Sequence, residues 1–96
     1  MLAKNRIIEI AKDVATANLT SSSVSNIVSD SAIDSEGREA LRITIVIKPG
    51  AVTKIRGDAA LDTLVQIQDR LREAGEERFP IVEYATQEEL EESGDS

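Results

Sequence analysis

One stretch of the sequence restricts the fold more than any other, because its pattern fits a β-strand and little else. Large apolar residues occupy every second position, at Leu41, Ile43, Ile45 and Ile47. Alternate side chains of a strand point to opposite faces of a sheet, so these four predict one buried face. Arg42 and Thr44 fall on the other face, where Val46 is the one large apolar residue. The rest of the chain has to cover the isoleucine-rich face.

Composition limits both the core and the chemistry. The 96 residues suit a single domain. Phe79 and Tyr84 are the only aromatic residues, so the core must be aliphatic, which leaves a small margin of stability and favours self-association. The chain has neither cysteine nor histidine, and therefore lacks a thiolate, the commonest general base and the commonest metal ligand. We expect no enzymatic activity, no cofactor and no bound metal.

Charge and hydropathy indicate where the protein works. No apolar run approaches the about 18 residues of a membrane span, and the N-terminus lacks a secretory signal. We therefore expect a cytoplasmic protein without a membrane partner. The net charge is −7, and nine of the 18 acidic residues but only one of the 11 basic residues lie from Glu73 onward. The acidic charge thus argues against nucleic-acid binding for the C-terminal quarter rather than for the whole fold.

The remaining elements follow from periodicity and turn residues. Residues 3–18 predict a helix, residues 24–33 an irregular strand, and 51–57 one helical turn. Asp34–Gly37 predicts a turn that pairs this strand antiparallel with the isoleucine-rich one. Asp58 is a predicted N-cap for a helix over 58–74, which ends at Gly75. The broad apolar face of that helix comprises Ala60, Leu61, Leu64, Val65, Ile67, Leu71 and Ala74.

The C-terminal part of the chain predicts a third strand and a short helix. Residues 79–85 suit an edge strand, and we expect Phe79 and Ile81 to face the core. Val82 and Tyr84 would then stand on the open face of the sheet beside Val46. Residues 86–89 match a capping box for a helix through Leu90 or Glu91, and residues 93–96 should be disordered.

Together these elements predict an α+β domain of two layers over residues 1–86, followed by an acidic helical turn and tail over 87–96. Two helices pack on one face of a three-stranded mixed sheet in the order α-β-β-(α)-α-β, with the third strand parallel to the second. Over residues 3–85 this order resembles BolA-like proteins and type II KH domains. The resemblance implies the fold, and nucleic-acid binding for a KH domain. A KH domain needs a GxxG loop, and BolA-like proteins bind their iron–sulfur partner through a histidine. The chain departs from both families, because it has no GxxG motif and no histidine.

A nucleic-acid or anion site is the alternative functional hypothesis. Its candidate residues are Arg42, Lys48, Lys54 and Arg56. Three of them precede the second long helix, whose free N–H groups could hold a phosphate. Asp58 and Asp62 occupy the same helix start and favour self-capping instead, so nucleic acid is the less favoured partner. The acidic tail would compete for this surface. The acids around the hairpin lack the loop spacing and central glycine of a calcium-binding EF-hand.

The leading hypothesis is a protein-interaction or regulatory module without catalytic activity. Its candidate binding residues are Val46, Val82, Tyr84, Glu88 and Glu89. They combine an aromatic side chain and an acidic flank at an edge strand, and a partner strand could extend the sheet at that edge. The expected partner is another protein of basic character, or a second copy of the chain in a homodimer.

Overall fold

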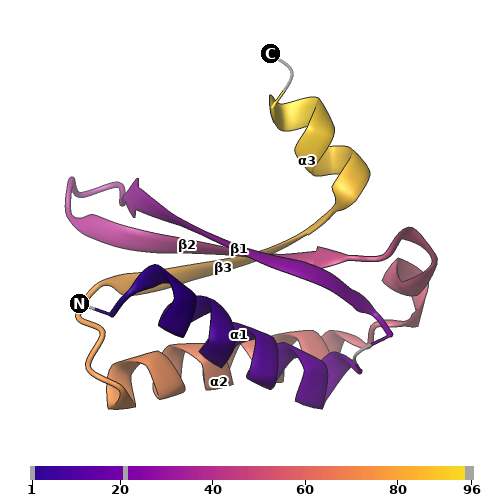
Figure 1. Ribbon diagram of the computed structural model, residues 1–96, viewed down its shortest axis with the longest axis horizontal. Coiled ribbons are helices and arrows are strands. Elements are labelled where there is room, and N and C mark those ends of the chain that lie inside the picture. Colours follow the sequence, from indigo (N-terminus) through magenta and orange to yellow (C-terminus); the bar gives the residue numbers. More distant parts are fainter. Residues whose placement is uncertain (1, 21, 95–96) are drawn as a thin grey trace.

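The predicted order of elements is confirmed. A computed structural model describes residues 2–20 and 22–94 of the chain. Its elements are α1 (Lys4–Leu19), β1 (Val24–Ile33), β2 (Glu39–Ile47), the 3₁₀ helix η1 (Pro49–Lys54), α2 (Gly57–Glu73), β3 (Phe79–Thr86) and α3 (Gln87–Gly94). α1 and α2 lie side by side on one face of the sheet, and α3 projects from the other side (Figure 1). The protein is therefore an α+β domain with a helix layer and a sheet layer.

The three strands form one mixed sheet in the order β1-β2-β3. β1 is antiparallel to β2, with Ile27 opposite Ile45, and β3 is parallel to β2, with Tyr84 opposite Ile45. The predicted hairpin and the predicted parallel third strand are thus confirmed. β2 is the central strand, while β1 and β3 are the two edges of the sheet.

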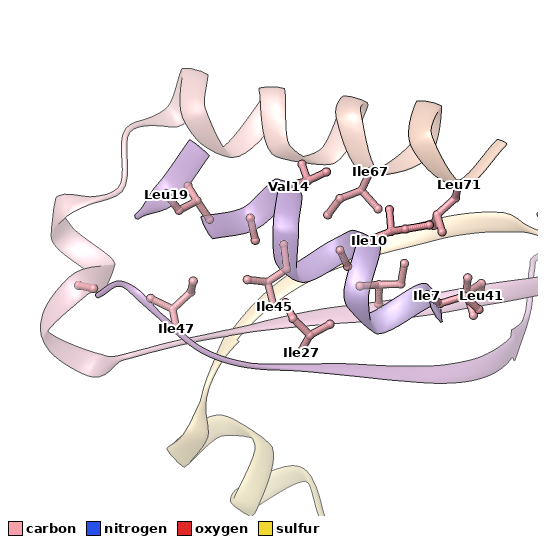
Figure 2. Close-up of a cluster of buried hydrophobic side chains, with 14 residues drawn as sticks. Ile7, Ile10, Val14, Leu19, Ile27, Leu41, Ile45, Ile47, Ile67 and Leu71 are labelled. Carbon is pink, nitrogen blue, oxygen red and sulfur yellow. The ribbon is translucent and has the colours of Figure 1, made fainter. Parts of the chain in front are cut away.

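The core lies between the sheet and the two long helices, as the alternation in β2 predicts. The buried cluster comprises Ile7, Ile10, Ala11, Val14, Ala15, Leu19, Ile27, Leu41, Ile43, Ile45, Ile47, Ala51, Ile67 and Leu71. The labelled side chains of α1 lie between α2 and the strands, with Val14 close to Ile67 of α2 (Figure 2). All of these residues are aliphatic, so the core depends on branched side chains rather than on aromatic rings.

The other face of β2 is more buried than the sequence indicates. Val46 has no exposed surface, and Thr44 is buried with it. Both residues have a neighbouring strand on each side, and the Thr44 hydroxyl donates to the Glu83 carboxylate at 3.2 Å. Val46 is therefore not available to a binding partner.

The predicted orientation of β3 is wrong. Val82 and Tyr84 pack against the core, and the Tyr84 hydroxyl donates to the Ala60 carbonyl of α2 at 2.8 Å. Phe79 is 60% exposed. A physical reason is the charge on Glu83, because the predicted orientation would place its carboxylate under the helices, where an unpaired charge is costly.

The predicted apolar face of α2 is too broad. The helix buries Thr63, Ile67 and Leu71, whereas Leu61 and Val65 are 64% and 49% exposed. Leu64 is only half-buried and lies outside the core cluster. Only one side of the helix faces the core, so apolar residues that extend around it cannot all be covered.

The start of α2 and the end of α3 differ from the predicted positions. α2 begins at Gly57, one residue before the predicted N-cap, and Asp58 lies in its first turn. Gly75 follows the helix at a positive φ of 102°, as predicted. The capping box of α3 is confirmed, because Thr86 and Glu89 exchange hydrogen bonds of 3.2 Å with each other's main-chain N–H. α3 extends to Gly94, so residues 93–94 are helical rather than disordered, and residues 95–96 lie outside the described part.

Candidate protein-binding site

Large exposed apolar side chains gather at one end of the sheet. Ile33 at the end of β1 is 67% exposed, and Phe79 at the start of β3 is exposed to a similar degree. Both line a hollow of about 630 Å³, together with Ile81 of β3. The charged residues at this hollow are Asp34, Arg38, Glu39 and Glu77. We call it the hairpin-end hollow, because the β1–β2 hairpin forms one of its walls.

The hairpin wall is held by Asp34. One oxygen of its carboxylate accepts hydrogen bonds of 2.9 Å from the main-chain N–H groups of Glu36 and Arg38. Gly37 takes a positive φ of 82°, which glycine adopts without strain and which closes the turn. The hydrogen bond from the Arg38 main chain is the largest of several contacts that lower the pKa of Asp34. The turn is thus a defined, negatively charged structure at neutral pH.

The opposite wall is held by a buried ion pair in the loop between α2 and β3. The Glu76 carboxylate is completely buried, and it accepts hydrogen bonds from the Arg78 guanidinium at 2.9 and 3.0 Å. It also accepts from the main-chain N–H groups of Arg78 at 3.0 Å and Leu2 at 3.1 Å. The Arg78 side chain contributes most to lowering the pKa of Glu76 to about 2. This pair fixes the residues on either side of Arg78, which are Glu77 and Phe79 at the hollow.

Sequence reasoning missed the Glu76–Arg78 pair. A signal was present, because Arg78 is the only basic residue among the acids that follow Arg72. A lone base in an acidic segment has many carboxylates to choose from, and the sequence does not say which of them is buried. The Leu2 main-chain N–H, from the other end of the chain, contributes to the choice because it donates to the Glu76 carboxylate.

The rim of the hairpin-end hollow carries an excess of negative charge. Arg38 pairs with Asp34 at 3.2 Å and with Glu36 at 2.7 Å, so its charge is compensated within the turn. Glu39 and Glu77 have no ion pair within the described part of the chain. The hollow therefore combines an apolar floor with an acidic rim.

The structure does not bring the predicted protein-binding residues together. Val46 is buried on one face of the sheet, whereas Val82 and Tyr84 face the helices on the other. Glu88 and Glu89 lie in the first turn of α3. Glu89 serves the cap of that helix, where its carboxylate accepts from the Thr86 hydroxyl at 3.1 Å and from the Thr86 N–H.

The predicted anion-binding residues are also separated. Arg42 lies on β2, 3.9 Å from Glu83, and six residues of strand, or roughly 20 Å, separate it from Lys48. Lys48 and Lys54 are exposed at the two ends of η1. Arg56 pairs with Asp58 at 3.2 Å, and Asp58 also accepts from a main-chain N–H at the start of α2. These four residues do not form one basic surface.

Comparisons with known proteins add no identity. No family model, curated protein or solved structure gives a significant match to the chain. Among residues 2–20 and 22–94, no group of three or more acidic side chains is placed to hold a metal ion. None of the helices in this part is both long and apolar enough to cross a bilayer. The assignment of the candidate site therefore rests on the geometry of the structure alone.

Proposed function

We propose that this protein is a cytoplasmic, non-catalytic interaction module that binds a basic partner protein through the hairpin-end hollow. One observation carries the proposal. The only phenylalanine of the chain is exposed, and it lines the same hollow as the exposed Ile33. Apolar patches with a charged rim are typical of protein interfaces.

The apolar floor would supply the binding energy. Covering Phe79 and Ile33 removes their side chains from water, which contributes roughly 1.5–3 kcal/mol for each before the costs of association. Both walls are already fixed, one by the Asp34 turn and the other by the Glu76–Arg78 pair. Little ordering is therefore needed when a partner binds, and this favours affinity.

The acidic rim would select the partner. Glu39 and Glu77 are exposed beside the floor, and an apolar side chain flanked by lysine or arginine complements this arrangement. Charge complementarity chiefly raises the association rate and rejects acidic competitors. We expect binding to weaken as salt increases, since salt screens exposed charges.

The test is affinity capture from native cells with the wild-type protein and with Phe79→Ser as bait, followed by titration with the purified partner. We expect a basic protein that Phe79→Ser binds at least about tenfold more weakly. Ala17→Ser is the control, because Ala17 is exposed on α1 and does not line the hollow. Equal binding of the partner to Phe79→Ser and wild type would contradict the proposal, as would an affinity that does not depend on salt.

A further inference from the structure

The outer edge of β3 has no partner strand among the described residues, because β2 lies on its other side. Two hydrogen bonds show which main-chain groups face outward. The Pro80 carbonyl accepts from a side chain of α2 at 3.3 Å, and the Thr86 N–H donates to a side chain of α3 at 3.2 Å. Alternate residues of a parallel strand point their N–H and C=O the same way, so Val82 and Tyr84 also direct theirs outward. The outward groups of Val82 and Tyr84 can pair with another strand, whereas Pro80 has no N–H and its carbonyl and the Thr86 N–H are already hydrogen-bonded.

A stripe along α2 lies beside that edge. Its residues recur at spacings of three and four: Asp58, Leu61, Val65, Gln68 and Arg72. We call it the α2 stripe. It faces the β3 side of the helix, since Gln68 is the side chain that donates to the Pro80 carbonyl. Leu61 and Val65 make its centre apolar and exposed, while Asp58 at one end pairs with Arg56 at 3.2 Å and Arg72 at the other end pairs with Asp69 at 3.8 Å.

The α2 stripe is complementary to itself. Asp58 lies seven residues before Val65, and Arg72 lies seven residues after it. Two such stripes packed antiparallel therefore place apolar residues against apolar residues in the middle. They also place each Asp58 near Arg72 of the other copy, so the favourable charge contact occurs twice. An isologous contact of this kind is the usual arrangement in a symmetric dimer.

We propose that this surface is the interface of a homodimer, in which β3 pairs antiparallel with β3 of a second copy and the two α2 stripes pack together. The strand register follows from charge. Residues opposite one another in an antiparallel pair point to the same face of the sheet. The two-fold axis of the homodimer therefore passes between the two copies of one residue of β3. An axis at Glu83 would oppose two carboxylates, which is unfavourable, whereas an axis at Val82 sets Glu83 against Ile81 of the second copy.

The helix and the strand place the two-fold axis at the same level. The Tyr84 hydroxyl contacts the Ala60 carbonyl, and Gln68 contacts Pro80. Halfway between these contacts, Val82 on the strand is level with the residue before Val65 on the helix. The axis that suits the strand register therefore suits the α2 stripe within one residue.

The homodimer places the second copy beside the hairpin-end hollow. With the axis at Val82, the residue opposite Phe79 is Ala85 of the second copy, and α3 of that copy begins opposite Glu77. The two sheets become one continuous sheet. The homodimer and partner binding are distinguished by their residues, because Phe79 lines the hollow whereas Val65 lies on the α2 stripe.

The first test is the oligomeric state of the full chain by sedimentation velocity over a concentration series. We expect a reversible dimer that Val65→Glu weakens at least about tenfold, with unchanged circular dichroism because Val65 is exposed. Ala17→Glu makes the same kind of change on the exposed side of α1 and should leave the dimer intact. A wild-type monomer at concentrations up to about 500 μM would overturn the proposal. So would a dimer that Val65→Glu does not weaken.

The second test uses charge reversal across the α2 stripe. Asp58→Arg and Arg72→Asp should each weaken the dimer by about three- to tenfold, and the double variant should recover most of the loss. Recovery requires that the two positions meet between copies, because they are too far apart on one helix to meet within a chain. Additive losses in the double variant would overturn the antiparallel packing. Capture of a different protein that depends on Val65, by a chain that stays monomeric, would assign the surface to that protein.

Discussion

The two walls of the hairpin-end hollow are each held by an arginine and a carboxylate, but the two pairs differ in their exposure to water. The Arg38 side chain is 71% exposed beside Asp34, whereas Arg78 is 12% exposed beside the fully buried Glu76. An exposed pair contributes little by itself, and Asp34 acts mainly through its bonds to the main chain. A buried pair cannot lose one member without leaving an unpaired charge out of water. The same chemistry therefore shapes a turn at one wall and stabilises the fold at the other.

The largest effect should come from the buried pair. Glu76→Ala removes the acceptor for the Arg78 guanidinium and for two main-chain N–H groups, and should lower the free energy of unfolding by about 3–5 kcal/mol in urea denaturation. Glu77→Ala is the matched control, since Glu77 is its exposed neighbour, and should change stability by less than about 0.5 kcal/mol. Similar losses for both variants would show that the buried Glu76–Arg78 pair does not account for the loss of stability.

Acid should weaken the buried pair in a defined range. Glu76 has a pKa of about 2 in the folded protein and an ordinary value of 4.5. Its contribution, of order 3 kcal/mol, is therefore complete above about pH 4.5 and is lost as the pH falls towards 2. Unfolding measured between pH 6 and about pH 2.5 should show this slope in the wild type and a reduced slope in Glu76→Gln. Equal slopes would show that Glu76 is not the group responsible.

The exposed wall should respond less. Asp34→Ala removes the acceptor for two main-chain N–H groups of the turn, so Tm should fall by less than half of the decrease that Glu76→Ala causes. Amide exchange should become faster in the hairpin but not in the loop between α2 and β3. A decrease in Tm as large as that of Glu76→Ala would contradict the comparison.

The fold could be predicted from the sequence where one period dominated. In β2, apolar and polar residues alternate, and the buried face is the predicted one. In β3, both sets of alternate positions carry large apolar residues, so periodicity could not choose between them. The register against β2 and the charge of Glu83 decide that Val82 and Tyr84 face the core. Contacts between segments that are distant in the sequence therefore determine which face of β3 points to the core, because the local pattern does not.

The candidate site was harder to predict for the same reason. Phe79 and Ile33 line the same hollow only because the hairpin ends beside the start of β3, and they are far apart in the sequence. The buried Glu76 contradicts the usual exposure of glutamate, and only the four hydrogen bonds that its carboxylate accepts explain its position. Thr63 in α2 is buried because its hydroxyl donates to the Ala59 carbonyl at 2.8 Å. Polar residues that satisfy their hydrogen bonds in this way are not visible in a hydropathy pattern.

One comparison tests the central claim, that the hairpin-end hollow serves binding rather than folding. Peptides selected from a random display library against the wild-type protein provide defined probes, and Phe79→Ser is compared with wild type in unfolding and in peptide titration. We expect Phe79→Ser to change the free energy of unfolding by less than about 0.5 kcal/mol. We also expect the selected peptides to carry lysine or arginine beside an apolar residue and to bind Phe79→Ser at least about tenfold more weakly than wild type. Peptides that bind both proteins equally would contradict it. A loss of stability above about 2 kcal/mol would instead assign Phe79 to the fold.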